Sequence, residues 1–278
     1  MTRYLPFHLH LGIIVMALAV GFLHHIVVEH PRQRRQMMGA LVAFVVVTIW
    51  PVGDLAASVS LTVATSQRLI IMLLVAPLML LATPTGVLVR LTRPRLVDPI
   101  VRRISHPGFA IILVTVVGTA TLSSAVVDAG AHSELVRDLT LLTVLGIGLI
   151  LWVPALAIMP GAKRLSPAAR AGYIFGSAVV VTSLSFVWIF SQHSLYPALH
   201  NQQALLHMTP VFDQQLAGFV AKLGCYIPMW IVAFLVFFRA DEAGVSVDES
   251  PLHWADVERT LLRLDREQAK KLRRHQPD

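Results

Sequence analysis

Long apolar runs separated by short polar segments dominate the chain. A helix needs roughly 20 apolar residues to cross a hydrocarbon core of about 30 Å. Runs close to or above this length are expected as spans at residues 9–28, 37–53, 69–91, 108–127, 139–159, 172–193 and 216–238. Helices are expected because a spanning segment must satisfy every backbone polar group internally. The pattern predicts an all-α polytopic membrane bundle of about seven transmembrane helices.

The second run is the shortest and ends at Trp50-Pro51. A mixed segment, residues 54–67, follows it before the third run begins. This segment is expected to form an interfacial helix or a re-entrant piece of chain.

Basic residues fall on one side of the predicted spans. Of the 23 Lys and Arg residues, 19 follow the first, third, fifth and seventh runs, whereas Arg3, Arg68 and Arg137 lie on the other side. Short cytoplasmic loops carry an excess of Lys and Arg. The alternation therefore predicts an outer N-terminus and a cytoplasmic C-terminus.

Composition agrees with a membrane protein. The chain is 55% hydrophobic, has a mean hydropathy of +0.68 and carries 14% charged residues, against about 25% in soluble domains. The net charge of +7 is explained by the basic loops, so no nucleic-acid partner is expected. A single cysteine, Cys225, excludes an intrachain disulfide or a CxxC metal site.

The pattern divides the chain into a transmembrane helix bundle, residues 1–240, and a cytoplasmic tail, residues 241–278. Ser250-Pro251 is a helix-start signal. Apolar residues then recur at helical spacing opposite a basic face. Such a helix is expected to bind anionic membrane lipid, with a solvated helix as the alternative.

The densest polar group on the predicted outer side lies between the last two spans. It contains His193, Tyr196, His200, His207, Met208, Asp213, Gln214 and Gln215. Imidazole and thioether groups are suitable ligands for copper. The four metal candidates are therefore His193, His200, His207 and Met208, although their spacing matches no tight metal motif, and an ordinary polar loop is the alternative.

Two other charged groups fall close to the apolar runs. Lys222 is expected to extend toward the outer headgroups, with an ion pair to Asp213 or Asp128 as the alternative. Arg68 is expected to form a local ion pair with Asp54. No hydrolase, P-loop or dinucleotide motif occurs in the sequence, so no enzyme is predicted.

Several stretches resemble the multi-span CtaG family of cytochrome c oxidase assembly factors. They are residues 67–84, Trp152-Val153-Pro154, and the segment from Tyr196-Pro197 to Asp213-Gln214-Gln215-Leu216-Ala217-Gly218. The resemblance covers residues 40–240, and the run from Asp213 to Gly218 is its most specific part. Family members usually carry two histidine pairs. The corresponding positions here are Ala64 and Arg68, and Arg137 and Leu141.

The resemblance implies an assembly or maturation factor for a respiratory haem-copper oxidase in a bacterial plasma membrane. It implies copper insertion or another maturation step on the outer face, with oxidase subunits or a copper carrier as partners. Asp213, Gln214, Gln215 and Tyr196 are then expected to line an outer binding pocket, with the four metal candidates as substitute ligands. Two alternatives remain: a metal-ion or small-solute transporter, and an accessory subunit of a respiratory membrane complex.

Overall fold

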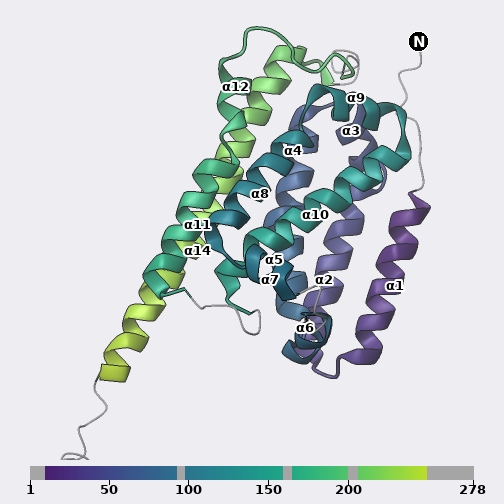
Figure 1. Cartoon of the computed structure of the whole chain (residues 1–278). Coiled ribbons are helices and arrows are strands. Elements are labelled where there is room, and N and C mark those ends of the chain that lie inside the picture. Colours follow the sequence, from purple (N-terminus) through teal and green to yellow (C-terminus); the bar gives the residue numbers. More distant parts are fainter. Residues whose placement is uncertain (1–9, 93–97, 159–164, 200–205, 249–278) are drawn as a thin grey trace, which may run out of the picture. The chain divides into compact units, whose positions relative to one another are not determined.

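The computed structural model describes residues 10–92, 98–158, 165–199 and 206–248, and every regular element in them is helical (Figure 1). The helices are α1 (Leu11–Val27), α2 (Pro31–Thr48), α3 (Val52–Ser58), α4 (Leu61–Ile70), α5 (Ala76–Ala82), α6 (Thr85–Thr92), α7 (Asp98–Ile104), α8 (Pro107–Ala120), α9 (Ser124–His132), α10 (Glu134–Leu156), α11 (Pro167–Val181), α12 (Leu184–Phe190) and α14 (Pro210–Asp248), with a π-helical turn η1 (Ile71–Val75) between α4 and α5. Residues up to Phe237 form one compact unit, which holds the contacts described below, and the chain from Phe238 onward forms a second. The predicted tail helix after Ser250 lies outside the described residues.

Three helical segments are long and apolar enough to cross a membrane: Leu61–Ala82, Glu134–Leu156 and Pro210–Arg239. Three bent helix pairs, α2 with α3, α8 with α9, and α11 with α12, raise the count of candidate spans to six. Helix α1 is apolar but shorter, with 17 residues. The described chain is therefore an all-helical integral membrane protein with three to six candidate spans.

The predicted bounds of the third span, 69–91, are wrong at both ends. Its helix begins at Leu61, because Ser60 caps it by accepting a hydrogen bond from the Val63 backbone N–H. It ends at Ala82, and Thr83 is extended with ψ of 120°. A residue before proline is disfavoured in the helical region, and Pro84 follows Thr83. The rest of the predicted span forms the separate helix α6.

The mixed segment 54–67 is divided between two helices. Its first part belongs to α3, a short helix at the end of α2, and its last part forms the start of α4. The first two turns of the third helical segment therefore contain polar residues that the sequence assigned to an interfacial helix or a re-entrant piece.

The π turn η1 accommodates Pro77. The Ala76 backbone N–H donates to the Ile71 carbonyl, and Pro77 has no N–H to offer. The Met72 carbonyl therefore loses its usual donor, and the Trp152 indole N–H donates to it over 2.8 Å. This side chain thus satisfies a backbone group that would otherwise be unpaired inside the bundle.

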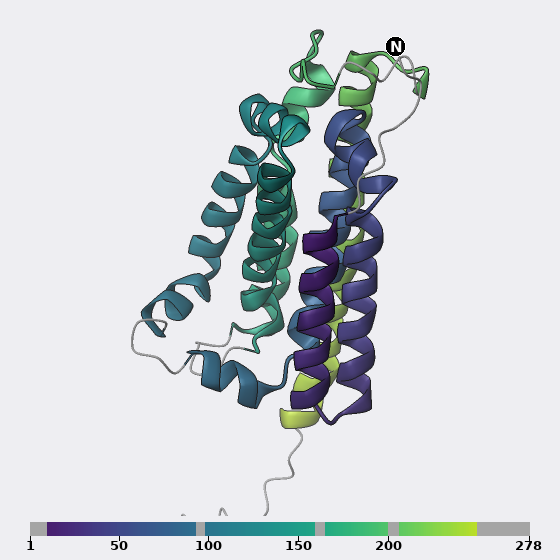
Figure 2. The ribbon, with the colours of Figure 1, turned by 90° about the vertical axis from the view of Figure 1, so that its right-hand side faces the viewer.

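Helix α10 lies at the centre of the bundle. It contacts α5, η1, α8, α9 and α11, and it buries Ile147, Leu151 and Trp152 in the main apolar core. Figure 2 shows α1 and α2 as the neighbouring purple pair, and these two helices contact each other. Short helices α3 and α9 contact each other at one end of the bundle (Figure 1).

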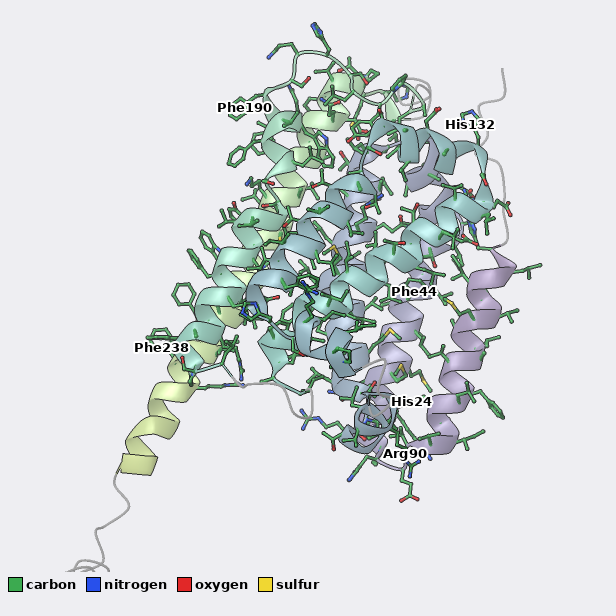
Figure 3. The ribbon with its side chains drawn as sticks, viewed as in Figure 1. His24, Phe44, Arg90, His132, Phe190 and Phe238 are labelled. Carbon is green, nitrogen blue, oxygen red and sulfur yellow. The ribbon has the colours of Figure 1, made fainter. Side chains whose placement is uncertain are left out.

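The two ends of the bundle carry different loops. His132 and Phe190 lie toward one end, and His24 and Arg90 lie toward the other (Figure 3). The first end also holds α3 and α9 (Figure 1), and it is called the α3–α9 end below. It contains the polar residues that build the candidate site.

Candidate functional site

A small cavity of about 60 Å³ lies at the α3–α9 end, bordered by residues of α3, α4, α9 and α10. Its walls include Ala64, Arg68, Arg137 and Leu141. These are the four positions at which the family resemblance expects histidine pairs. A second cavity, of about 80 Å³, also has Arg68 and Leu122 in its wall.

Arg68 lies between the two cavities on α4. Its guanidinium donates to the Thr121 hydroxyl over 2.8 Å and to the Thr121 carbonyl over 2.9 Å. Thr121 is the residue that ends α8. The predicted ion pair between Arg68 and Asp54 is wrong, because Arg68 turns toward α8 and Asp54 faces α10.

Asp54 instead pairs with Arg137, with 3.3 Å between the Asp54 Oδ1 and Arg137 Nη1 atoms. The Asp54 side chain is only 2% exposed and that of Arg137 is 12% exposed. Glu134 adds a more exposed carboxylate at 3.9 Å from Arg137. This buried pair joins α3 to the first turn of α10.

His10 is buried just before α1, and its Nδ1 atom lies 3.9 Å from the Asp138 carboxylate. Its Nε2 atom is buried without a hydrogen-bond partner. Burial lowers the pKa of His10, and the positive charge of Arg137 lowers it further. His10 is therefore expected to be neutral at pH 7.

Asp213 is fully buried at the start of α14 and binds the first turn of α4. Its carboxylate accepts hydrogen bonds from the Ser60 hydroxyl, the Leu61 N–H and the Thr62 N–H. The Thr62 hydroxyl also donates to the Asp213 carbonyl. A carboxylate at a helix N-terminus satisfies unpaired N–H groups and complements the helix dipole.

Gln214 and Gln215 hold the loop that follows α12. The Gln214 side-chain oxygen accepts from the Leu195 N–H over 2.8 Å, and its amide donates to the His193 carbonyl. The Gln215 amide donates to the Ser191 carbonyl over 3.4 Å. Neither glutamine, nor Asp213, borders the two cavities at Arg68.

Tyr196 connects the same loop to the end of α8. The Trp188 indole donates to the Tyr196 hydroxyl, which donates to the Leu122 carbonyl over 2.7 Å. Burial raises the pKa of Tyr196, so the phenol stays protonated and remains a donor. Tyr196 and Arg68 thus bind adjacent carbonyls, those of Leu122 and Thr121.

Lys222 is buried on α14, with 7% exposure. Its ammonium donates to the Tyr226 hydroxyl over 2.9 Å and lies 3.7 Å from the centre of the Phe186 ring. The prediction that Lys222 extends to the outer headgroups is therefore wrong. A cation over an aromatic face is stabilised without leaving the bundle.

Three of the four predicted metal ligands, His193, His207 and Met208, lie in the part of the chain that the structure describes. His193 and His207 are exposed and Met208 is half-buried. His200 lies outside the described residues. Across the described ranges, no three His, Cys, Asp or Glu side chains are close enough to hold a metal ion.

Sequence reasoning missed His10 and Asp138 as members of the candidate site, and it named Arg137 only as a position that carries histidine in the family. It assigned Arg68 a local structural role. The available signal was the presence of arginines and an aspartate inside or beside apolar runs, which is rare in membrane segments and marks functional positions.

A family model described as "Cytochrome c oxidase caa3 assembly factor (Caa3_CtaG)" matches residues 29–241. That range contains Arg68, Arg137, Tyr196 and Asp213, and it leaves out His10. No curated protein and no solved structure matches the chain.

Proposed function

The chain belongs to the family of caa3-type cytochrome c oxidase assembly factors, and from this premise we propose that it matures a haem-copper oxidase at the α3–α9 end of its bundle. Its family consists of assembly factors and is not known for catalysis. The proposed action is binding of an oxidase subunit or a copper carrier.

One observation carries the proposal. Two pairs of positions that lie far apart in the sequence, Ala64 with Arg68 and Arg137 with Leu141, border one cavity. Asp213 anchors the helix that carries the first pair, and the Asp54–Arg137 pair anchors the helix that carries the second. Asp213 of the family motif therefore does not border the cavity itself. It holds in place the helix α4, which forms one of the cavity walls.

We further propose a topology of seven spans, with the N-terminus and the α3–α9 end outside and the C-terminus in the cytoplasm of a bacterial plasma membrane. Six candidate spans together with the apolar helix α1 support this count. The inner-side assignment rests on Arg90, which lies at the end that holds His24 (Figure 3), and on the excess of Lys and Arg after alternate apolar runs of the sequence. Labelling of single cysteines placed at Ser133 and Arg90 from outside intact cells tests it. Labelling at Ser133 alone is expected, and labelling at Arg90 alone would reverse the topology.

Copper is part of the proposal as a cargo. No three His, Cys, Asp or Glu side chains come together among the described residues, but His207 and Met208 are adjacent, and His207 is exposed. Imidazole and thioether donors suit copper, so the proposal has these two residues share an ion with donors of a partner. The test measures copper binding to the purified protein by titration, and copper transfer from a copper-loaded carrier. The same measurements are made on the double variant His207→Ala plus Met208→Ala. Copper binding or transfer that is unchanged in the double variant would exclude these ligands.

Gene deletion and complementation test the assembly role. Deletion is expected to abolish oxidase activity and to alter the spectra of its copper centres. Ala64→Leu, which fills the cavity, is expected to accumulate to normal levels without restoring activity. Val63→Leu, one residue away and outside the cavity wall, is the matched control and is expected to restore it.

Three outcomes contradict the proposal. Normal oxidase activity after deletion excludes the assembly role. Metal uptake into liposomes by the purified protein favours the transporter alternative. Stoichiometric copurification with the mature oxidase favours the accessory-subunit alternative.

A further inference from the structure

We propose that Arg68 binds a single carboxylate group in the cavities that it borders. The argument rests on the charge of Arg68, on the hydrogen bonds that it leaves unused, and on the size and lining of the space beside it.

Arg68 is a cation without a paired carboxylate among the described residues. None of the described carboxylates forms an ion pair with Arg68: Asp54 and Glu134 pair with Arg137, Asp213 binds the first turn of α4, and Asp128 and Asp138 lie 3.9 Å from His132 and His10. Residues 1–9 and 200–205, which lie outside the described ranges, contain no Asp or Glu.

The partners that Arg68 does have compensate its charge only in part. A guanidinium has five N–H donors, and two of them reach Thr121. The Thr121 carbonyl at the end of α8 contributes the partial negative charge of a helix C-terminus. A full positive charge within an apolar bundle is costly unless an anion pairs with it. Three N–H groups of Arg68 therefore remain to bind one.

The space beside Arg68 has the size of a small group. The two cavities measure about 60 and 80 Å³, which is room for several water molecules or one carboxylate by the volume that a single water requires. Arg68 itself is half-buried, so part of its surface faces this space.

The other cation in the lining is Arg137, which is paired with Asp54 through its Nη1 atom, whereas its buried Nε atom has no hydrogen-bond partner. The Gln67 amide donates to the Val47 carbonyl and the Thr140 hydroxyl to the Val136 carbonyl. Ala64, Leu122 and Val126 are apolar. A planar carboxylate matches the fork of a guanidinium and gains two parallel hydrogen bonds, which a spherical halide cannot.

Thermal unfolding of the purified full-length protein in detergent tests the site. Sodium acetate replaces sodium chloride at constant ionic strength, at pH 7.5. A ligand that binds only the folded state raises the Tm, and a rise of about 2–4 °C is expected once acetate exceeds its Kd several-fold. In a second arm, N-acetylglutamate amide replaces acetate. A shift with acetate alone indicates a small free carboxylate, and a shift with both indicates that an acidic side chain also enters.

Three variants decide whether Arg68 is responsible. Arg68→Gln is expected to lose the shift, and the exposed-residue control Arg90→Gln is expected to keep it. Because Arg68→Gln could unfold, Ala57→Leu provides a second variant that narrows the cavity with Arg68 intact, and it is expected to reduce the shift. The absence of a shift in the wild type overturns the proposal. An equal shift in Arg68→Gln means binding of an adventitious ion only and overturns it as well.

Discussion

The carboxylate of Asp213 accepts hydrogen bonds from the Ser60 hydroxyl and from the Leu61 backbone N–H, each over 2.7 Å. Ser60 and Leu61 precede Asp213 by 153 and 152 positions in the sequence. The contact joins α14 to the first turn of α4, and α4 carries Ala64 and Arg68. The buried Asp213 carboxylate therefore helps to fix the start of α4, the helix that forms one wall of the cavity.

Replacing Asp213 is expected to destabilise the protein more than replacing an exposed aspartate. Asp213→Ala removes hydrogen bonds to a charged acceptor and leaves the first N–H groups of α4 unpaired, for a loss of about 2–3 kcal/mol. Chemical unfolding in detergent measures it. Asp128→Ala, with a side chain that is 58% exposed, is the control and should cost less than about 0.5 kcal/mol. Equal losses in the two variants would contradict the capping role.

Two glycines on α10 are expected to respond to alanine with opposite signs. A Cβ atom at Gly148 would lie 3.0 Å from the Ala76 Cβ and the Met72 Cα atoms, whereas one at Gly146 would meet nothing within 4 Å. Gly148→Ala forces α10 away from the π turn and is expected to cost about 1–3 kcal/mol. Gly146→Ala gains helix propensity and is expected to stabilise by up to about 1 kcal/mol. Unfolding midpoints of both variants are measured in one detergent. Equal changes in the stability of the two variants would show that the close contacts at Gly148 do not disfavour a Cβ atom there.

The sequence predicted the all-helical membrane fold because long apolar runs report directly on the bilayer, whereas the count of seven spans and the topology stay predictions. It misplaced the third span because its start depends on Ser60 and Asp213, which are distant in the sequence, and its end depends on the local effect of Pro84 on Thr83. A window of hydropathy cannot detect either effect.

The candidate site was predictable only in part. The family motif identified Tyr196 and Asp213, but not that both use their polar groups to hold Leu122 and the start of α4. Arg68 and Arg137 are visible in the sequence as charges near apolar runs. Their meeting at one cavity depends on the tertiary arrangement that brings residues of α4 and α10 to the same wall, which no local pattern encodes.

Stability is expected to fall below about pH 6.5 because of His10. The pKa of its folded form is lowered, so the unfolded chain takes up a proton near the ordinary value of about 6.5 while the folded protein does not. The stability that depends on neutral His10 is thus present above that pH and is lost as the pH falls. Arg137 opposes protonation, and Asp54, Asp138 and Glu134 favour it.

Unfolding midpoints at pH 7.5 and pH 5.5 test this dependence. The wild type is expected to lose more stability across this interval than His10→Gln. His132→Gln is the control, since the His132 side chain is 76% exposed, and it should follow the wild type. A His10→Gln profile that matches the wild type at both pH values would exclude His10 as the titrating group.

The Asp54–Arg137 pair is expected to show strong coupling in a double-mutant cycle. Arg137→Leu leaves the Asp54 carboxylate, which is 2% exposed, without its cationic partner, and such a loss costs about 3–5 kcal/mol. Asp54→Asn leaves a buried guanidinium and is also destabilising. The double variant removes both charges, so it is expected to be more stable than Arg137→Leu alone, with a coupling energy of about 1–3 kcal/mol. Chemical unfolding of the four proteins gives this energy.

The control cycle uses the exposed pair of Asp128 and His132. The coupling energy of this pair should be less than about 0.5 kcal/mol because both side chains are exposed. Additive losses at Asp54 and Arg137 would mean that the two charges are compensated separately and that their contact does not hold α3 to α10.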